Sequence, residues 1–583
     1  MKIRLLLLSV LFYFNAHSQI IKRSELLGRV TDSEISIQLM FTDSVEAYVE
    51  YGTNSGALTN SCPVMNFYPD SSGVFTINGL TSNTQYYYRV QCRHFGTGPY
   101  SPRPEYTFHT QRPVGSSFTF DIQADPHMDT SSDAALYARC LQNQLEDQPD
   151  FMIDLGDVLM TDKLKNAAGV IPYDTIPYRC DLMRSFYEQT CHSVPLFMTL
   201  GNHEGEAGWL NNGTANCIPI WSSNLRKKYF LNPTPNSFFS GDTSHIPFVG
   251  QRGGYYSWQW GDALFIVIDP YWYTNPKPDA THGWYWTLGE TQYNWLKTTL
   301  QNSTAQYKFV FSHQIVGGDP QGRGGIEFAD LYEWGGKNSD STQGFATNRP
   351  GWYKPIKDLL TENRVTVFFH GHDHFYGQQK KDCLIYQETP QPSLPNFNYP
   401  NFASSYGYLQ GVIVANSGHL RVNVSPNGVQ VDYVRAYRAQ DTSATRHNKD
   451  ISATYFIGPV NCYDSLSTGS PIIWNNDYAN EIIYPNPFSS ETAIDFTVNN
   501  QENLSLSIYS IEGKLVRRLL DDNKLSDGNY KIIWDGCDGK GNKLPSGTYV
   551  YKFKSEHLNN SGKIILKFIT YIIIIIISMN NYI

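Results

Sequence analysis

The sequence contains no run of basic residues, and its formal net charge is −9. Because binding to nucleic acid or to an anionic membrane requires a positively charged surface, we expect neither partner. Charged residues make up only 17% of the chain while aromatic residues make up 14%, a composition that excludes a disordered protein. An anionic substrate would therefore have to be attracted by local charge, such as that of bound metal ions.

The nine cysteines include no C-x-x-C pair, so a zinc site built on thiolates is not expected. An odd count leaves at least one cysteine unpaired within the chain. Cys180 with Cys191 and Cys62 with Cys92 are the disulfides that proximity in the sequence favours.

No apolar run reaches the roughly 20 residues that a membrane-spanning helix needs. Residues 1–18 instead have the pattern of a signal peptide, with Lys2 and Arg4 ahead of a short apolar stretch and small residues before Gln19. We therefore expect an exported protein; the alternative is a buried first strand. Residues 568–583 form an atypical tail with six consecutive isoleucines, which we interpret as a frameshifted or read-through terminus.

Residues 24–112 read as short strands of alternating polarity separated by turn residues, as in a β-sandwich. Strands are expected over residues 35–39, 45–51 and 86–90. The stretch from Gly79 to Val90 resembles the corner and following strand of a fibronectin type III domain, like the N-terminal domain of purple acid phosphatases. A spacer that packs against the next domain is favoured over a carbohydrate or surface contact.

From Ser116 the pattern changes to fully apolar strands separated by helical segments, which indicates a layered α/β domain with buried sheets. Five of these strands end in polar side chains. In chain order the polar groups are Asp125 and His127, then Asp157, then Asn202 and His203, then His313, and finally His372 and His374. Because ligands gather at the carboxyl ends of strands in α/β sheets, we expect these groups to converge on one place.

The last of these strands ends in His370-Gly371-His372-Asp373-His374. In extended backbone His372 and His374 point to the same side, about 6.5 Å apart along the chain. That separation suits one imidazole for each of two metal ions, which lie about 3.5–4 Å apart in hydrolytic sites.

These motifs, in this order, resemble the calcineurin-like metallophosphoesterase family, which includes the purple acid phosphatases. The resemblance covers roughly residues 116–440 and implies a domain over residues 113–460. The implied fold is α/β: a four-layer β-sandwich flanked by helices. Residues 260–269 resemble the central strand of the family, and residues 290–296 resemble the helix that follows it.

The resemblance also implies two metal ions, each with its own set of ligands. One ion would be bound by Asp125, His127, Asp157 and His374. The other would be bound by Asp157, Asn202, His313 and His372. Asp157 would bridge the ions, which its two carboxylate oxygens allow. Oxygen and imidazole ligands without thiolate favour iron, manganese or zinc, and the sequence does not distinguish among them.

The implied activity is hydrolysis of phosphate esters by a metal-bound hydroxide, with Asn202 and His203 contacting the substrate. His203 is the candidate acid that protonates the leaving group; the alternative is that it orients Asn202 or Asp157. Glu204 is expected to be a local anchor. Arg323 could hold a substrate phosphate, although a solvated loop arginine is the favoured alternative, and Arg349 has the same status.

One position departs from the family. Purple enzymes carry a tyrosine three residues after the bridging aspartate, where it binds ferric iron, and this chain has Met160 there. The first motif offers His127 instead. We therefore expect a colourless enzyme.

Residues 478–567 resemble the C-terminal sorting domain of proteins exported by the type IX secretion machinery of Bacteroidetes. That machinery is therefore an expected partner, and the expected location is secreted or on the outer cell surface. Asp535, Asp538 and Asn542 lack the spacing of an EF-hand calcium loop, so a turn-rich hairpin is expected there.

Three functions compete. The first is a secreted phosphomonoesterase, similar to an acid phosphatase. The second is a phosphodiesterase or nucleotidase with the same metals, its substrate selected by loops such as residues 204–255 and 314–350. The third is a surface adhesion protein with a non-catalytic phosphoesterase scaffold, which the complete set of expected ligands argues against.

Overall fold

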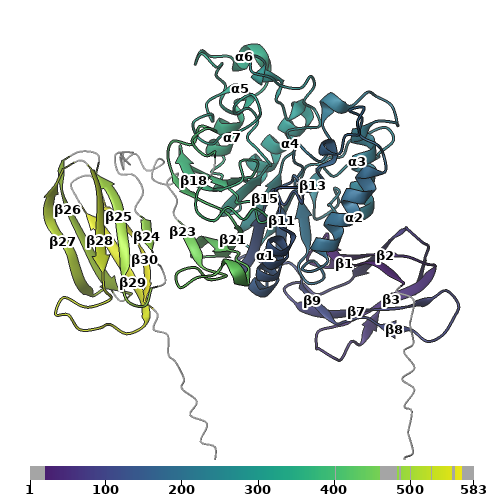
Figure 1. Cartoon of the computed structure of the whole chain (residues 1–583), viewed down its shortest axis with the longest axis horizontal. Helices are drawn as coiled ribbons and strands as arrows, with labels where there is room; N and C mark the ends of the chain where they lie inside the picture. Colours follow the sequence, from purple (N-terminus) through teal and green to yellow (C-terminus); the bar gives the residue numbers. More distant parts are fainter. Residues whose placement is uncertain are drawn as a thin grey trace, which may run out of the picture.

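The computed structural model describes residues 20–400, 402–459, 482–484, 488–498, 501–511, 513–526, 528–554 and 559–566. The predicted signal peptide and the isoleucine-rich tail lie outside these residues. The described chain forms an N-terminal β-sandwich, a central α/β body and a C-terminal β-sandwich (Figure 1). None of its helices combines the length and the apolar character needed to cross a bilayer.

The N-terminal sandwich consists of two antiparallel sheets. One has the order β1 (Ile21–Gly28), β2 (Glu34–Phe41) and β6 (Ser72–Asn78). The other contains β3 (Val45–Gly52), β4 (Asn60–Ser61), β5 (Met65–Phe67), β7 (Gln85–His94), β8 (Ser101–Pro102) and β9 (Tyr106–His109). The Tyr86 hydroxyl accepts a hydrogen bond from the Thr81 backbone N–H (2.9 Å), the corner contact seen in immunoglobulin-like sandwiches. The fibronectin type III assignment itself stays a prediction.

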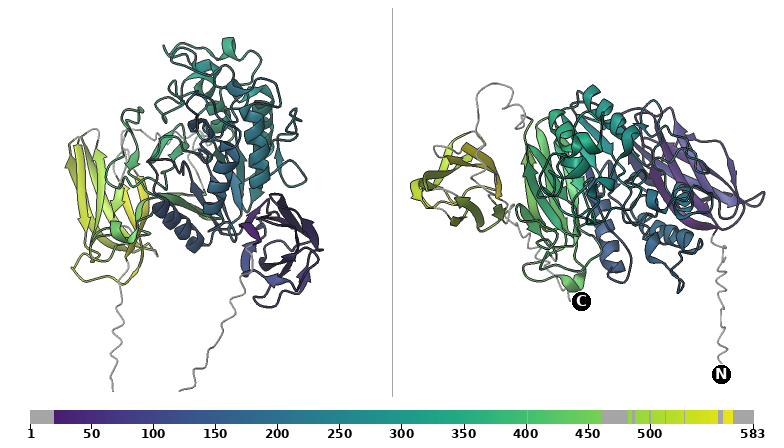
Figure 2. Two further views of the ribbon diagram at one scale, coloured as in Figure 1. Left: turned by 45° about the vertical axis from the view of Figure 1, so that its right-hand side comes forward. Right: turned by 90° about the horizontal axis from the view of Figure 1, so that it is seen from above.

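This sandwich packs directly on the central body, as both views of Figure 2 show. Leu26 and Met40 are fully buried in the same apolar cluster as helix α2 (Thr175–Tyr187) of the central body. The Tyr88 hydroxyl donates to the His192 carbonyl (2.6 Å), and the buried Arg184 guanidinium donates to the Ser24 carbonyl (2.7 Å). The N-terminal sandwich is therefore packed against the central body, and its role as a spacer stays a prediction.

Two face-to-face sheets form the centre of the α/β body. The first runs in the order β12 (Leu196–Met198), β11 (Phe151–Asp154), β10 (Phe118–Gln123), β21 (Gly418–Ser425), β22 (Gly428–Arg435) and β23 (Ile451–Ile457). The second runs in the order β13 (Ser240–Gly241), β14 (Tyr256–Trp260), β15 (Ala263–Val267), β16 (Tyr307–Phe311), β17 (Val367–His370), β19 (Leu384–Glu388), β18 (Tyr376–Lys381) and β20 (Val412–Val414). Strands β10, β11 and β12 are parallel, as are β15, β16, β17 and β19, so their carboxyl ends lie at common edges.

Phenylalanines from both sheets fill the space between them: the Phe120 and Phe265 rings, one from each sheet, pack edge to face at 5.0 Å. The outer face of the first sheet is covered by α1 (Ala134–Asp147), α2 and α3 (Ile218–Tyr229). That of the second is covered by α4 (Gly289–Asn302), α5 (Tyr332–Gly335) and α7 (Ile356–Glu362). The four layers match the predicted α/β arrangement. The short elements α6 (Phe345–Asn348), η1 (Thr161–Lys163), η2 (Gly208–Leu210), η3 (Gly283–Tyr285) and η4 (Ala439–Asp441) lie in connections.

The C-terminal sandwich packs two antiparallel sheets around a core that includes Leu506 and Trp534. Its sheets are β24 (Ile482–Tyr484), β25 (Thr492–Val498) and β28 (Gly528–Trp534), and β27 (Leu515–Leu525), β26 (Glu502–Ser510), β29 (Gly547–Lys554) and β30 (Asn559–Leu566). Asp538 accepts the backbone N–H groups of Lys540 and Asn542 at 2.9 Å, so this aspartate builds the predicted turn.

The predicted disulfides are wrong, because Cys62, Cys92, Cys180 and Cys191 are all free. Cys62 lies beside β4 and Cys92 in β7, on opposite sides of β3, so about 9.5 Å of sheet separates their strands. That exceeds the reach of a disulfide, about 7 Å between Cα atoms. Cys180 and Cys191 are both fully buried, and the Cys191 sulfur points at the Met152 sulfur (3.7 Å). Cys383 is disulfide-bonded.

Candidate metal centre

The predicted polar side chains converge where parallel strands of the two sheets end. Asp125 and His127 follow β10, Asp157 follows β11, Asn202 and His203 follow β12, His313 follows β16, and His372 and His374 follow β17. Six of these eight residues form two groups, each with its donor atoms within 4.8 Å of one another. The groups are Asp125, His127 and His374, and Asp157, His313 and His372.

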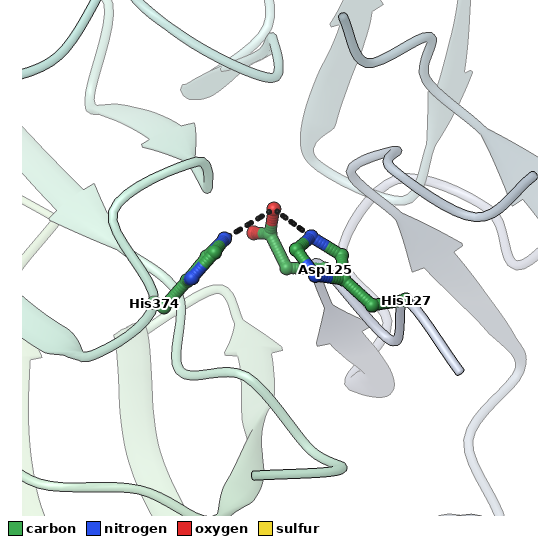
Figure 3. A group of neighbouring side chains, drawn as sticks. All are labelled: Asp125, His127 and His374. Atoms are coloured by element: carbon green, nitrogen blue, oxygen red, sulfur yellow. Dashed lines mark ion pairs between the residues drawn. The ribbon is translucent and has the colours of Figure 1, made fainter. Parts of the chain in front are cut away.

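In the first group one carboxylate oxygen of Asp125 faces two imidazoles (Figure 3). Its Oδ1 lies 3.5 Å from His127 Nε2 and 3.4 Å from His374 Nε2. Asp125 Oδ1 and His127 Nε2 are buried and have no hydrogen-bond partner among the described residues. Buried polar atoms without a partner are costly, and a shared cation would satisfy these.

In the second group four electron-rich atoms meet around His313. Its Nε2 lies 3.1 Å from Asn202 Oδ1, 3.1 Å from His372 Nδ1 and 3.2 Å from Asp157 Oδ2. The far nitrogens are already engaged: His313 Nδ1 with the Leu155 carbonyl (2.9 Å), and His372 Nε2 with the Gln321 carbonyl (3.1 Å).

A nitrogen that faces a carbonyl must carry the ring proton, so His313 Nε2 and His372 Nδ1 present lone pairs to each other. Such an arrangement is repulsive unless a cation or a proton lies between the atoms. Without a bound cation a proton takes this place: burial disfavours a protonated His313, yet the Asp157 and Asp125 carboxylates outweigh burial and raise its pKa to about 9. The residues present therefore fit a metal ion.

Asp157 lies between the two groups. Its Oδ2 is 3.2 Å from His313 Nε2 and 3.6 Å from His127 Nε2, one imidazole from each group. A carboxylate is the side chain that can bind two cations at once, so this position has the geometry of a bridge.

The backbone at these residues is unusual, and the extended backbone predicted for His372 and His374 is wrong, because β17 ends at His370 and both residues have positive φ. The five residues Asp125, His127, Asp157, His372 and His374 all have positive φ, between 50° and 80°. Side chains other than glycine rarely adopt this region, and it clusters at functional sites.

Two glycines permit the close approach of the loops that carry Asp157 and Asn202. A Cβ on Gly156 would lie 2.4 Å from the Gly201 nitrogen, and one on Gly201 would lie 2.3 Å from the Asp157 nitrogen. Any larger residue at either position would push these loops apart.

His203 lies beside the two groups but belongs to neither. Its Nδ1 is 2.7 Å from Asp162 Oδ1, and its Nε2 is 3.9 Å from Asp157 Oδ2. Its backbone N–H donates to Asp157 Oδ1 (2.8 Å). The Asp162 carboxylate holds the proton on Nδ1 and fixes the ring orientation, so Nε2 faces the centre. This placement is compatible with both predicted roles.

Glu204 has the position of an anchor. Its buried carboxylate accepts the backbone N–H groups of Asp157 (3.0 Å), Val158 (2.6 Å) and Leu159 (3.1 Å), as well as that of Gly201. Burial, with the neighbouring Asp157 carboxylate, raises the pKa of Glu204 to about 7. This side chain ties the loops after β11 and β12 together.

Arg323 is not a solvated loop arginine. Its guanidinium donates to the His372 carbonyl (2.8 Å) and to Asp373 Oδ1 (3.0 Å), and it lies 4.3 Å from the centre of the Tyr406 ring. Both hydrogen bonds come from Nη1, so this nitrogen supports the histidine loop. Arg349 is also structural, because it pairs with the buried Glu333.

A layer of supporting acids was not predicted from the sequence. Asp373 Oδ2 accepts from the Gly324 backbone (2.9 Å) and the Tyr408 hydroxyl (2.8 Å). Glu388 accepts the Asp373 backbone N–H (3.0 Å) and lies 2.8 Å from His370 Nδ1. Asp373 was detectable, since it stands between two candidate ligands. Nothing in the sequence pattern singles out Glu388 or Asp162.

The comparisons with known proteins agree with this geometry. Residues 118–376 match the sequence model of the calcineurin-like phosphoesterase family, and residues 486–558 match that of the FlgD Ig-like domain. No curated protein sequence matches the chain significantly.

Two solved structures have a similar fold. The PhoD structure shares 14% sequence identity with this chain. The match covers 76% of this chain and 91% of the PhoD chain, with a TM-score of 0.55. The purple acid phosphatase PPD1 from yellow lupin (Lupinus luteus) is 13% identical, covers 75% of this chain and 74% of its own, and has a TM-score of 0.50. The central body therefore has the fold of these two structures, matches the calcineurin-like phosphoesterase family over residues 118–376, and contains candidate residues for a dinuclear metal site.

Proposed function

We propose that this protein hydrolyses phosphate monoesters at a centre of two metal ions. The observation that supports it is the convergence of Asn202 Oδ1, Asp157 Oδ2 and His372 Nδ1 on His313 Nε2, with a second group of Asp125, His127 and His374 beside it. Two bound cations supply the charge that neutralises phosphoryl oxygens and lowers the pKa of water. Iron, manganese and zinc are the candidate metals.

The side chains of this chain divide the remaining work. Asp157 would hold the two ions together, and Asn202 would contact both an ion and the substrate. His203, held by Asp162, would keep a proton on Nε2 and deliver it to the leaving oxygen. The leaving group needs that proton because an alkoxide is a poor leaving group.

Phosphodiester hydrolysis is the second candidate, and one observation favours it. A monoester dianion carries more charge than a diester and benefits from a free cationic side chain. Arg323 donates from Nη1 to Asp373 and to the His372 carbonyl, so this nitrogen is not free to bind the extra negative charge of a monoester.

The test is elemental analysis of protein purified without chelator, beside assays of a monoester and a diester at several pH values. At least two metals per chain, with turnover lost on chelation and restored by Mn²⁺, Zn²⁺ or Fe²⁺, would support the proposal. The ratio of kcat/KM for the two esters then selects between the candidates. Protein that is folded, metal-loaded and inactive on both esters would instead favour a scaffold role.

We also propose that the protein is exported, with residues 1–18 removed and the C-terminal region serving as a type IX sorting domain. The disulfide at Cys383 fits an oxidising compartment, although the seven free cysteines among the described residues, six of them buried, do not require one. Mass spectrometry of protein from the culture medium should find an N-terminus at Gln19. Protein that keeps Met1 and stays in the cell would contradict export, and release of a variant lacking residues 478–567 would contradict the sorting role.

A further inference from the structure

A second cluster of metal-ligand side chains lies outside the candidate centre, between the first sheet and helix α1. It consists of Asp121 in β10, Asp147 at the end of α1 and His419 in β21. One donor atom from each residue lies within 4.8 Å of the others. The side chains of Asp121 and His419 are fully buried, and that of Asp147 is 2% exposed.

Asp121 is the anomaly in this cluster, because no described residue donates a hydrogen bond to either of its carboxylate oxygens. The facing nitrogen is His419 Nε2, 3.7 Å from Asp121 Oδ2. The same nitrogen lies 2.9 Å from Asp147 Oδ2. One ring nitrogen carries at most one proton, so it cannot satisfy two carboxylates. A buried carboxylate without a donor is costly.

The nearby cationic side chains do not relieve Asp121. Arg421, its cross-strand partner, donates instead to Asp147 Oδ1 (3.2 Å) and to Asp432 (3.0 Å). Lys449 Nζ lies 3.0 Å from the same Asp147 Oδ1. These cations compensate one oxygen of Asp147 and leave its Oδ2 facing His419 and Asp121.

We propose that Asp121, Asp147 and His419 bind a third divalent metal ion, of the zinc or manganese class. Ligand atoms about 2.1 Å from a tetrahedral ion are about 3.4 Å apart, close to the 2.9 and 3.7 Å separations seen here. Two carboxylates with one imidazole form a ligand set that such metals accept.

The other ring nitrogen supports this assignment. His419 Nδ1 lies 3.8 Å from the Cys140 sulfur, and a proton on Nδ1 that points to the sulfur leaves the Nε2 lone pair for the ion. The same hydrogen bond would hold the ring in the orientation that metal binding requires.

The third ion would have a structural role. It would join α1, β10 and β21 at one point, and β10 is the strand that leads to Asp125. Asp121 precedes Asp125 by four residues, about 13 Å along an extended strand, so the ion lies too far away to touch substrate at the centre. It would hold the strand that presents Asp125.

The test counts metal in the full-length protein after removal of metal with chelator, reloading with Zn²⁺ and gel filtration. We expect Asp121→Asn and His419→Gln each to bind one equivalent less than wild type. Asp432→Asn is the matched control: it touches Arg421 but lies outside the cluster, and should bind as wild type does. The difference of one equivalent does not depend on occupancy of the candidate centre.

Asp157→Asn separates this ion from the dinuclear centre. In the Asp157→Asn background, adding His419→Gln should still lower the metal content by one equivalent. In the same background Zn²⁺ should raise Tm by a few degrees when His419 is present, and should not raise it in the His419→Gln variant. Equal metal content and an equal Zn²⁺-dependent rise in Tm in wild type, Asp121→Asn and His419→Gln would overturn the proposal and show that Asp121 is instead buried in its protonated form. Because Asp121→Asn is nearly isosteric, it gives an answer even if His419→Gln does not fold.

Discussion

Two buried clusters of aspartate and histidine lie on β10, one at its end and one in its middle, and they differ in backbone and in charge compensation. At the end, Asp125 and its neighbours have positive φ, and the His374 side chain is 28% exposed. In the middle, Asp121 is in regular strand and fully closed under α1. The same residue types therefore form an accessible centre in one place and a closed one in the other.

The charges near the clusters differ in the same way. Arg421 and Lys449 bind Asp147 directly, so the middle cluster carries its own cations. At the strand end Arg323 binds Asp373 and a backbone carbonyl, and Arg179 binds the His127 carbonyl, rather than a ligand carboxylate. The negative charge of Asp125 and Asp157 is left for metal ions. Exposure at the strand end is thus what distinguishes the candidate metal centre from the closed middle cluster, in which Asp121 also has no cationic partner.

The strongest test of this difference is Asp157→Asn. An amide cannot supply two anionic oxygens to two cations, so turnover should fall on the order of a thousandfold or more, as when a group that stabilises transition-state charge is lost. Circular dichroism and Tm should show a folded protein. Asp432→Asn, on the same sheet as the middle cluster, is the control and should keep full activity. Comparable activity in the two variants would refute the two-metal mechanism.

A smaller loss is expected for His203→Gln. Removing a general acid costs about a hundredfold or more, but only when the leaving group needs a proton. The kcat for an alkyl phosphate should therefore fall much further than that for 4-nitrophenyl phosphate, whose leaving group departs as an anion. Asp162→Asn should show the same selectivity with a smaller loss. An equal loss on both substrates would assign His203 to orientation of Asn202 or Asp157 instead.

A still smaller loss of activity is expected when a supporting acid is substituted. Asp373→Asn weakens the bond to Arg323 and thereby the histidine loop, and changes of this kind cost roughly 10–100-fold in metal affinity or activity. Titration of the variant with Mn²⁺ should show weaker binding, with turnover largely recovered at saturating metal. Turnover that stays low at saturation would show that Asp373 acts on more than the position of the ligands.

Strand-end chemistry is the part of this molecule that the sequence predicted well. The predicted residues meet because parallel strands share an edge, a rule that needs no knowledge of side-chain packing. Apolar runs that switch to polar residues are visible in the chain, so the four layers and the convergence of Asp125, Asp157 and His313 could be anticipated.

What the sequence could not predict depends on distances between segments far apart in the chain. The prediction of a disulfide between Cys62 and Cys92 was wrong because sequence proximity does not reveal that β3 lies between them. Asp121 and His419 are almost 300 residues apart, and each alone is an ordinary polar residue in a strand. Likewise, only the folded chain shows that Arg323 is committed to Asp373.

The smallest effect is expected for substitution of Asp154, whose hydrogen bonds lie between the two clusters. Its Oδ1 accepts the Gly156 backbone N–H (2.9 Å) next to Asp157. Its Oδ2 accepts from Gln123 and Tyr187 at 2.6 Å, and Gln123 in turn accepts from Gln144 of α1 (2.9 Å). Burial raises the pKa of Asp154 to about 6, although the hydrogen bonds from Tyr187 and Gln123 oppose it.

Because the folded pKa exceeds the ordinary value of 3.8, this group stabilises the fold fully below pH about 4, and that contribution is lost as pH rises through about 6. The shift of about two units corresponds to at most about 3 kcal/mol. Asp154→Asn should remove this pH dependence, so Tm measured by calorimetry should fall less between pH 4 and 7 than in wild type, with turnover changed only severalfold. If the two Tm profiles run parallel, Asp154 is ionised at both ends of the range, and the network between the clusters is held by charge rather than by a shared proton.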